Sequence, residues 1–291
     1  MSCEPGPRLS VPAELRAAVE VLAATGAGSP RVDAELLLAH LLGRSRTQLL
    51  LAGGLDAGTA VRYRELVGQR AEGIPLQHLT GTAPFRHLEL VVGPGVFIPR
   101  PETELVLELA TAQLRVAGTV VDLCAGSGAI ALAVAQEYPA ARVVAVERSA
   151  AALEWLRRNA TARAAAGDRP IEVVPADVTD PGLLAGLTGS VDVVLSNPPY
   201  VPERLRAELS VEVSHDPDEA VFAGEDGLAL MPGLLRTAAR LLRPGGLAVI
   251  EHDESQPKSM TRLLIEGQSW HTVAAHTDLA GQARFATAHR R

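Results

Sequence analysis

Hydrophobic and polar positions change their period along the chain near Leu79. Before this point Ala, Leu and Val recur at helical spacing, which predicts short helices. The first helix is expected within residues 10–26. The second is expected to have Ser29 as its cap and Pro30 at its first position, and to end at Gly43. Its repeating apolar positions are Val32, Leu36 and Ala39. A third helical stretch carries Val61, Tyr63, Leu66 and Val67. These segments predict a small helical bundle.

Beyond Leu79 the pattern is first that of a hairpin and then that of alternating strands and helices. Residues 87–91 alternate polar and apolar side chains between glycine-rich turns, which predicts a β-hairpin. Apolar strands are predicted at 119–123, 142–147, 171–174, 191–196 and 247–252, and helices at 101–116, 128–138, 150–163 and 228–242. This alternation predicts a parallel sheet with helices on both faces. Two final strands, at 270–275 and 284–288, are expected to pair as an antiparallel edge hairpin.

These changes of period predict three parts of the chain. Residues 1–78 form a helical domain that serves packing or substrate docking, residues 79–98 form a β-hairpin linker, and residues 99–291 form an α/β domain.

Charge and cysteine content narrow the possible partners. The net charge is −7 and no basic run is present, which favours a basic protein partner over a long nucleic-acid duplex. Cys3 and Cys124 are too few for a disulfide framework or a zinc site. Neighbouring residues around His252 alternate between the two faces of a strand, so no metal site is predicted.

With no signal-peptide pattern and no apolar run of membrane-spanning length, we expect a cytoplasmic protein without membrane contact.

A glycine-rich turn after the strand at 119–123 is the candidate cofactor loop. It consists of Cys124, Ala125, Gly126, Ser127 and Gly128 and leads into a helix, so its amide N–H groups can face a ligand. Glu147 ends the next strand, where a carboxylate can accept both ribose hydroxyls of a nucleoside. The loop alone also fits a dinucleotide-binding pattern. Asp122, placed to contact the amino-acid part of S-adenosylmethionine, and the motif after the fourth strand favour S-adenosylmethionine over NAD.

The candidate acceptor motif follows the strand at 191–196 and reads Asn197-Pro198-Pro199-Tyr200. A rigid loop would explain the prolines but not the flanking Asn and Tyr. An amide or exocyclic amino nitrogen is a poor nucleophile because its lone pair is delocalised. The Asn197 side-chain oxygen and the Pro198 carbonyl could accept its two hydrogens and orient the nitrogen towards the methyl group. Tyr200 could pack against the flat acceptor group. This chemistry needs no general base before attack.

With both motifs in place, the sequence resembles the peptide-chain release factor glutamine N5-methyltransferases, the PrmC/HemK family, over nearly its whole length. The resemblance is carried by IPLQHLTG at 74–81, FIPRPETE at 97–104, the loop at 122–131, NPPY at 197–200, HDP at 215–217 and GEDGL at 224–228. Near the end of the chain, Glu251, Gln256, Asp278, Gly281 and Arg284 recur in the family's pattern.

The resemblance implies a Rossmann-like class I methyltransferase domain, with a seven-stranded, mostly parallel sheet and an antiparallel edge strand, behind a small helical domain and a β-hairpin linker. It implies S-adenosyl-L-methionine as cofactor, with contacts at 124–128, Glu147, Asn197 and the Asp177-Val178 pair. Asn197, Pro198 and Tyr200 would be catalytic, and Pro199 would join them in binding the substrate. The implied substrate is the Gly-Gly-Gln glutamine of release factors 1 and 2, modified by a monomer that does not contact nucleic acid directly.

Two rival functions follow from the same motifs. Adenine presents a similar amino group, so an adenine-N6 methyltransferase is one alternative, but it needs a base-flipping pocket and a basic surface. A non-catalytic S-adenosylmethionine-binding scaffold is the other. The intact Asp122, glycine loop, Asn197 and Tyr200 argue against it.

Overall fold

The computed structural model describes residues 8–116 and 118–291, so Cys3 lies outside the described residues. Contacts divide the chain into two compact units. One comprises the residues up to Gly81 together with Ser210–His215, and the other comprises Thr82–Leu209 and Asp216–Arg291. Each unit is described by itself.

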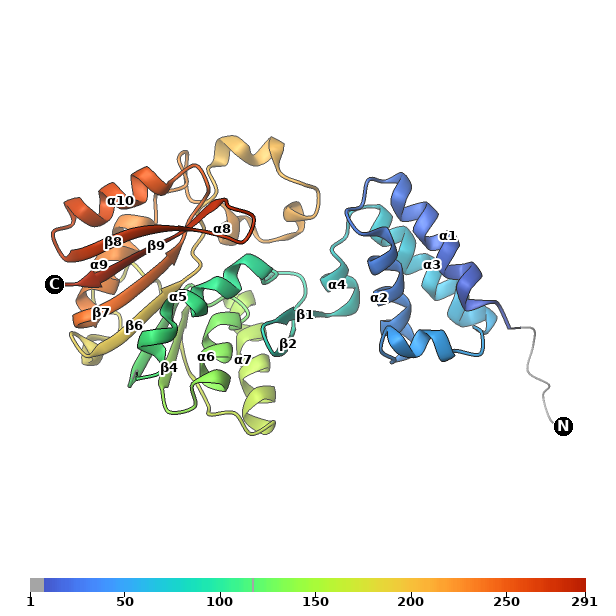
Figure 1. Cartoon of the computed structure of the whole chain (residues 1–291), viewed down its shortest axis with the longest axis horizontal. Coiled ribbons are helices and arrows are strands. Elements are labelled where there is room, and N and C mark those ends of the chain that lie inside the picture. Colours follow the sequence, from blue (N-terminus) through green and yellow to red (C-terminus); the bar gives the residue numbers. More distant parts are fainter. Residues whose placement is uncertain (1–7, 117) are drawn as a thin grey trace. The chain divides into compact units, whose positions relative to one another are not determined.

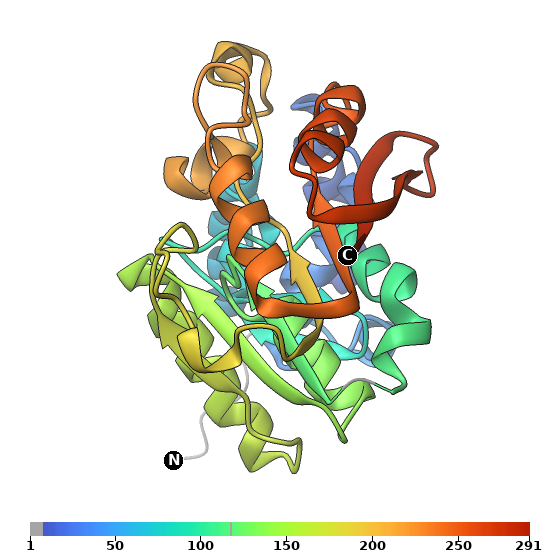
Figure 2. The ribbon, with the colours of Figure 1, turned by 90° about the vertical axis from the view of Figure 1, so that its left-hand side faces the viewer.

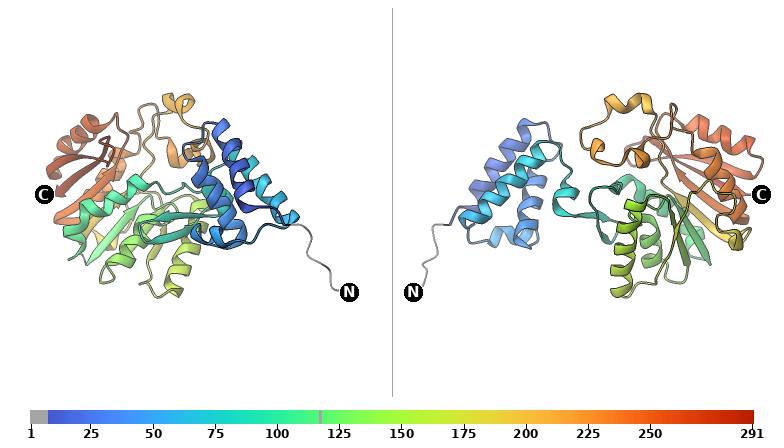
Figure 3. Two further views of the ribbon diagram at one scale, coloured as in Figure 1. Left: turned by 45° about the vertical axis from the view of Figure 1, so that its right-hand side comes forward. Right: turned by 180° about the vertical axis from the view of Figure 1, so that it is seen from behind.

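The first unit is built on three helices that pack side by side (Figure 1, Figure 3). They are α1 (Val11–Ala24), α2 (Pro30–Leu42) and α3 (Ala57–Ala71), followed by the short α4 (Leu76–Thr80). Their core is formed by large apolar side chains, and the hydroxyl of the buried Tyr63 donates to the Ala34 carbonyl at 2.9 Å. The predicted helical bundle is therefore present.

The cap position of Ser29 and the place of Pro30 at the start of α2 are as predicted, and the structure adds two details. Ser29 occupies the cap position of α2, but its side chain makes no capping bond; in α3, by contrast, Asp56 accepts a hydrogen bond from the Thr59 N–H at 2.9 Å. The buried side of α2 is formed by Ala34, Leu37, Leu38 and Ala39, whereas Val32 is 36% exposed. Because α2 packs against both α1 and α3, its buried face is wider than one apolar repeat and is rotated away from Val32.

Segment 210–215 belongs to this unit although it follows the acceptor motif in sequence. Arg70 donates to Asp33 at 2.8 Å and also pairs with Glu212. A Cβ on Gly73 would lie 2.6 Å from a methyl carbon of Val211, so glycine allows this close approach. The pattern of apolar residues gave no sign of this long-range association.

The second unit begins with the hairpin of β1 (Thr82–Phe85) and β2 (Leu88–Val91), which pair antiparallel. The side-chain amide of Asn159 binds the backbone at the end of β2. It accepts from the Val91 N–H at 2.8 Å and donates to the Val91 and Ser127 carbonyls, both at 3.0 Å. Helix α4 reaches Thr80, so the first residues assigned to the linker are helical. The domain limits at 78/79 and 98/99 remain a prediction.

The centre of the second unit is a sheet of seven strands in the order β5-β4-β3-β6-β7-β9-β8. The strands are β3 (Thr119–Leu123), β4 (Arg142–Glu147), β5 (Glu172–Pro175), β6 (Val191–Ser196), β7 (Leu242–Glu251), β8 (Trp270–Thr277) and β9 (Ala283–Arg290). The first five are parallel, and β9 runs antiparallel between β7 and β8. The predicted Rossmann-like sheet with an antiparallel edge is confirmed.

Helices cover both faces of this sheet (Figure 1, Figure 2). Successive strand residues point to opposite faces, so Val120 joins one apolar layer and Val121 the other. The first layer contains α5 (Leu105–Leu114), α6 (Ala129–Glu137) and α7 (Ala150–Ala165), and the second contains α9 (Met231–Leu241) and α10 (Pro257–Glu266). The helix α10 was not predicted.

The remaining elements are the short α8 (Asp218–Val221) and five 3-10 turns, η1 (Thr47–Leu51), η2 (Pro101–Glu104), η3 (Ala185–Leu187), η4 (Glu203–Glu208) and η5 (Val213–His215).

Candidate active site

The candidate cofactor loop lies at the carboxyl edge of the parallel strands, where open α/β sheets bind ligands. It leaves β3 with positive φ values at Cys124 (66°), Gly126 (54°) and Gly128 (90°). A Cβ on Gly126 would meet nothing within 4 Å, so the backbone there is open to a ligand. A Cβ on Gly128 would lie 2.5 Å from a methyl carbon of Leu156, so this glycine serves the packing of α6 against α7. The two glycines thus have different roles.

Asp122 lies beneath this loop and is fully buried. Its Oδ2 accepts from the Ala131 N–H at 3.1 Å, which fixes the first turn of α6, while Oδ1 has no hydrogen-bond partner among the described residues. Burial raises the pKa of Asp122 well above its usual value, and the nearby charge of Glu147 adds to the effect. Burial likewise raises the pKa of the Cys124 thiol, which therefore stays protonated.

The carboxylate of Glu147 accepts hydrogen bonds from the cofactor loop and from the two residues after Glu147. Oε2 accepts from the Gly126 N–H at 2.8 Å, and Oε1 accepts from the N–H groups of Arg148 and Ser149, each at 2.8 Å. A carboxylate offers about four lone-pair directions, so one remains for a further donor. The structure thus places Glu147 beside the open backbone of Gly126.

The Asp177-Val178 pair follows β5 at the same edge. Asp177 Oδ1 accepts from the N–H and the hydroxyl of Thr179, and Oδ2 accepts from Arg148 at 3.3 Å. These bonds hold the pKa of Asp177 below its usual value. Val178 is buried in the apolar layer beside α9, and its carbonyl accepts from the Thr237 hydroxyl at 2.7 Å. The side chain of Val178 thus belongs to the core.

The acceptor motif leaves β6 next to the cofactor loop, because β6 pairs directly with β3. Asn197 Nδ2 donates to the Thr103 hydroxyl at 3.1 Å. This contact occupies the nitrogen end of the amide and leaves Oδ1 to accept from another group. Pro198 is buried, whereas Asn197 and Pro199 are half-buried. The arrangement fits an Asn197 oxygen that accepts an N–H hydrogen.

Tyr200 uses its hydroxyl in a way that the sequence did not predict. The hydroxyl donates to Glu251 Oε1 at 2.8 Å. Burial raises the pKa of Tyr200 well above its usual value, and the charge of Glu251 adds to this rise. The expected packing of Tyr200 against a flat acceptor remains a prediction. Its hydroxyl, however, is bonded to Glu251 in the protein interior.

A second set of bonds holds the loop after the motif. Gln256 Nε2 donates to the Tyr200 carbonyl at 2.8 Å and to the Asp226 carbonyl at 3.0 Å. Gly227 has a φ of +75°, and a Cβ there would lie 2.1 Å from the Tyr200 carbonyl oxygen. The GEDGL segment is therefore packed directly against the acceptor loop.

The arginine-proline segment is fixed by Asp216. The Ile98 N–H donates to Asp216 Oδ1 at 3.0 Å, and the Arg100 guanidinium pairs with Oδ2. Arg100 also lies 5.0 Å from the centre of the Phe97 ring. This pairing of the FIPRPETE and HDP segments precedes η2, which presents Thr103 to Asn197.

Three residues outside the predicted site are thus central to its geometry, namely Thr103, Glu251 and Gln256. All three lie in segments that carried the family resemblance, and that was the available signal. The sequence offered no reason to connect them with Asn197 or Tyr200.

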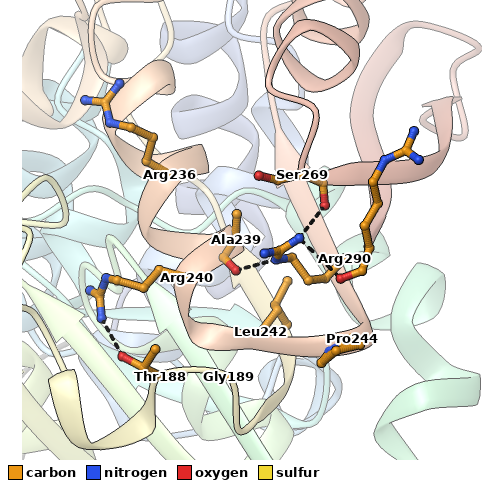
Figure 4. A pocket seen from close by; sticks show the side chains of 10 residues that line it. Thr188, Gly189, Arg236, Ala239, Arg240, Leu242, Pro244, Ser269 and Arg290 are labelled. Atoms are coloured by element: carbon orange, nitrogen blue, oxygen red, sulfur yellow. Dashed lines mark hydrogen bonds between the residues drawn. The ribbon is translucent and has the colours of Figure 1, made fainter.

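A hollow of about 500 Å³ lies elsewhere in this unit (Figure 4). It is lined by Thr188, Gly189, Arg236, Ala239, Arg240, Leu242, Pro244, Ser269, Arg290 and Arg291. Gly189 precedes β6 and Leu242 begins β7, so the hollow is at the edge where parallel strands start, opposite the cofactor loop. Arg240 and Arg290 bond to backbone carbonyls there. None of the predicted site residues lines it, so we do not assign the reaction to this hollow.

Neither a metal cluster nor a membrane helix is found in the part of the chain that the structure describes. No three His, Cys, Asp or Glu side chains gather there as a metal would require, and no helix there is long and apolar enough to cross a membrane.

The residues at the loop fit S-adenosylmethionine. The open backbone at Gly126 admits a ligand, and the remaining lone pair of Glu147 suits a ribose hydroxyl. Asp122 Oδ1, which has no partner among the described residues, supplies a buried polar atom beneath the loop. Together with the sheet order and the acceptor motif beside the loop, these groups indicate the class of protein: the chain is an S-adenosylmethionine-dependent methyltransferase with a Rossmann-like fold.

Comparisons with known proteins identify the family. The PrmC N-terminal domain matches residues 14–81, and the methyltransferase small domain matches residues 88–213. The chain is 49% identical to the release factor glutamine methyltransferase of Mycolicibacterium smegmatis, over 95% of this chain and 96% of that protein. It is 47% identical to the enzyme of the same name from Streptomyces coelicolor, over 96% and 97%. The chain belongs to the release factor glutamine methyltransferase family.

A solved structure supports the fold independently. A T. thermophilus 16S rRNA methyltransferase in complex with AdoMet and guanosine aligns with a TM-score of 0.51 at 22% identity, over 72% of this chain and 50% of that one. At this identity the likeness concerns the fold alone.

Proposed function

We propose that this chain transfers a methyl group from S-adenosylmethionine to the side-chain amide nitrogen, N5, of the glutamine in the Gly-Gly-Gln motif of release factors 1 and 2, and so supports translation termination. Membership of the release factor glutamine methyltransferase family supports a glutamine substrate. The observation that carries the proposal is the Asn197 amide, whose nitrogen is bound by Thr103 while its oxygen is available at the acceptor loop.

The chemistry follows from the orientation of the amide. S-adenosylmethionine supplies an electrophilic methyl carbon on a positively charged sulfur. Asn197 Oδ1 and the Pro198 carbonyl accept the two N–H hydrogens of the substrate glutamine and direct its nitrogen at that carbon. The nitrogen forms the new N–C bond, the S–C bond breaks with its electron pair left on sulfur, and one N–H proton leaves to solvent. Each carbonyl favours the positive charge that develops on the nitrogen.

The other parts of the proposal concern the partner. The helical domain at 1–78 docks the release factor, and residues 99–291 perform the transfer as a monomer in the cytoplasm, without direct nucleic-acid contact. The net charge of −7 supports a protein partner rather than a nucleic-acid backbone. Nothing in the structure or the comparisons favours the adenine or scaffold alternatives.

The decisive test is transfer of labelled methyl to a purified release factor, with mass mapping of the modified residue. We expect label on the Gly-Gly-Gln glutamine, and none when that glutamine is replaced by glutamate, which lacks the N–H₂ nucleophile. Asn197→Ala should lower kcat and kcat/KM together by about 10²–10³-fold, because the lost contact acts in the transition state. Label on nucleic acid, with none on a release factor, would reject the proposed function.

A further inference from the structure

Arginine side chains gather at the hollow of about 500 Å³ that lies opposite the cofactor loop. Four of the residues that line it are arginines: Arg236 and Arg240 in α9, Arg290 at the end of β9, and Arg291 after it. No aspartate or glutamate is among the lining residues. The hollow is therefore basic, although the chain as a whole carries a net charge of −7. The proposed methyl transfer does not use it.

The two half-buried arginines of the hollow bind neutral oxygens. Arg240 donates to the Leu183 carbonyl at 2.5 Å. Arg290 donates to the Ala239 carbonyl at 2.7 Å and to the Ser269 carbonyl at 3.1 Å (Figure 4). These bonds hold both guanidinium groups in place. They do not neutralise them, because a carbonyl carries no net charge.

The hollow also lacks ion pairs. None of its four arginines pairs with a carboxylate within the part of the chain that the structure describes. Arg291 is exposed and donates to the Trp270 carbonyl at 2.7 Å, and Arg236 is exposed on α9. By contrast, Arg243 near the start of β7 pairs with Asp192 at 2.7 Å. The arginines of the hollow thus lack the partner that this neighbour has.

The positive charge at the hollow exceeds what its surroundings offset. The carboxyl end of α9, which binds Arg290 through the Ala239 carbonyl, carries roughly half a negative elementary charge. Even a terminal carboxylate on Arg291 would balance only one further guanidinium. About two positive charges therefore remain without a counter-charge. An anion with several negative charges would be attracted to this position.

Donors for such an anion are available. The bonds of Arg290 use its Nε and Nη1 atoms, so the Nη2 hydrogens remain for a ligand. The Thr188 hydroxyl accepts from Arg240 at 3.2 Å, so its own hydrogen can also be donated (Figure 4). Guanidinium groups donate paired hydrogen bonds to carboxylate and phosphate oxygens. Several charges in one small ligand favour phosphate groups over a single carboxylate.

We propose that this hollow is a second ligand site, which binds a small molecule with two or more phosphate groups, such as a nucleoside triphosphate. Its volume of about 500 Å³ lies within the range of small-molecule pockets, about 300–1,000 Å³, so it accommodates more than one phosphate group. A nucleic-acid backbone would need basic residues that extend well beyond one hollow, and no basic run is present in the sequence. A compact ligand therefore fits the observed charge better than a duplex does.

The second ligand and the cofactor occupy opposite ends of the same sheet. Gly189, which lines the hollow, precedes β6, whereas Asn197 follows β6 at the cofactor edge. Leu242 lines the hollow where β7 starts. Because the two sites are at different edges of the sheet, both can be occupied at once. The second site is thus separate from the site of methyl transfer.

The test is a calorimetric titration of the full-length chain with ATP, GTP and pyrophosphate. The cofactor site is first filled with S-adenosylhomocysteine, the demethylated product, so that the adenosine part of ATP cannot bind there. We expect one saturable site per chain, with an affinity that falls as potassium chloride is added. Equal affinity for pyrophosphate and ATP would assign the binding to the phosphate groups alone, and tighter binding of ATP would add a contact with the nucleoside.

Single substitutions locate the binding at the hollow. Arg236→Gln and Arg291→Gln should each weaken ATP binding about tenfold, the lower end of the effect of a hydrogen bond to a charged group. Both residues are exposed, so the fold should be kept. Arg157→Gln is the matched control, because Arg157 is an exposed arginine on α7 that does not line the hollow. It should bind ATP as the wild type does, and all three variants should keep the wild-type rate of methyl transfer.

Three results would overturn the proposal. The first is the absence of saturable binding of ATP, GTP and pyrophosphate. The second is equal ATP affinity in the wild type, Arg236→Gln and Arg291→Gln. The third is binding of a single-stranded RNA oligonucleotide that depends on the same two arginines and is much tighter than that of ATP, which would assign the hollow to nucleic acid. The calorimetric readout needs no turnover, so it stands whether or not the chain methylates a release factor.

Discussion

Replacement of Gly227 by alanine tests whether the GEDGL segment sets the position of the acceptor loop. Gly227 has a φ of +75°, and a Cβ there would lie 2.1 Å from the Tyr200 carbonyl oxygen and 2.6 Å from Gln256 Nε2. Gly281 provides a matched control, because its φ is +82° and a Cβ there would meet nothing within 4 Å. The two substitutions share the backbone strain and differ in the collision.

The magnitudes follow from these distances. Alanine in the left-handed region costs about 1–2 kcal/mol, which both variants should show. Only Gly227→Ala must also move the Tyr200 carbonyl from 2.1 Å to the 3.0 Å below which Cβ contacts are essentially never found, a shift of about 0.9 Å. Overpacking of this kind adds about 1–3 kcal/mol of destabilisation. A displacement near 1 Å in a reacting geometry can lower the rate about 10²-fold.

Urea unfolding and steady-state methyl transfer to a release factor provide the readouts. Gly227→Ala should lose kcat by roughly 10²-fold while it keeps its affinity for S-adenosylmethionine, because the loop at 124–128 is not touched. Gly281→Ala should lose stability but keep its kcat. Equal kcat and equal stability in the two variants would refute the reasoning, since the collision would then have no consequence.

The remaining predictions concern the cofactor, the domains and pH. Glu147→Ala should weaken S-adenosylmethionine binding roughly 10- to 150-fold in calorimetry, the equivalent of about 1.5–3 kcal/mol for charge-assisted bonds, and unchanged affinity would remove Glu147 from the site. A chain that begins at Leu79 should bind the cofactor but lose most activity on a folded release factor, and a wild-type rate would reject the docking role. Glu251 binds its proton more tightly when folded, so its contribution to stability should fall as pH rises from 4.5 through about 7, by on the order of 3 kcal/mol. Glu251→Gln should lose this slope in urea unfolding at pH 5 and pH 8, and an unchanged slope would contradict the raised pKa.

The centre of the sheet could be predicted from the sequence because the strands β3, β4 and β6 are buried on both faces. Such strands read as continuous apolar runs, and the predicted limits of β3, β4 and β6 coincide with those in the structure. Helix α10 was missed although Pro257 is at its first position and Met260, Leu263 and Leu264 follow helical spacing. Only Met260 and Leu264 are buried, so the apolar signal of α10 is weak beside that of the strands.

The roles of individual glycines could not be predicted, because each depends on what lies opposite the missing Cβ. Gly126 and Gly128 are two residues apart in one loop, yet the first faces open space and the second faces Leu156. Gly227 faces a carbonyl that comes from a different loop. A glycine-rich pattern therefore predicts close approach in general, and the structure separates ligand access from packing.

The same limit applies to the two carboxylates that end apolar strands. Glu147 closes β4 and Glu251 closes β7, and the sequence suggested a site role for Glu147 alone. In the structure, Glu147 faces the start of α7 and the cofactor loop, so backbone N–H groups bind both of its oxygens. Glu251 accepts from the Tyr200 hydroxyl, its other oxygen has no partner among the described residues, and burial raises its pKa. Backbone donors hold Glu147 at the cofactor loop, whereas burial raises the pKa of Glu251 to about 7, and the place of each residue at the end of an apolar strand does not reveal this difference.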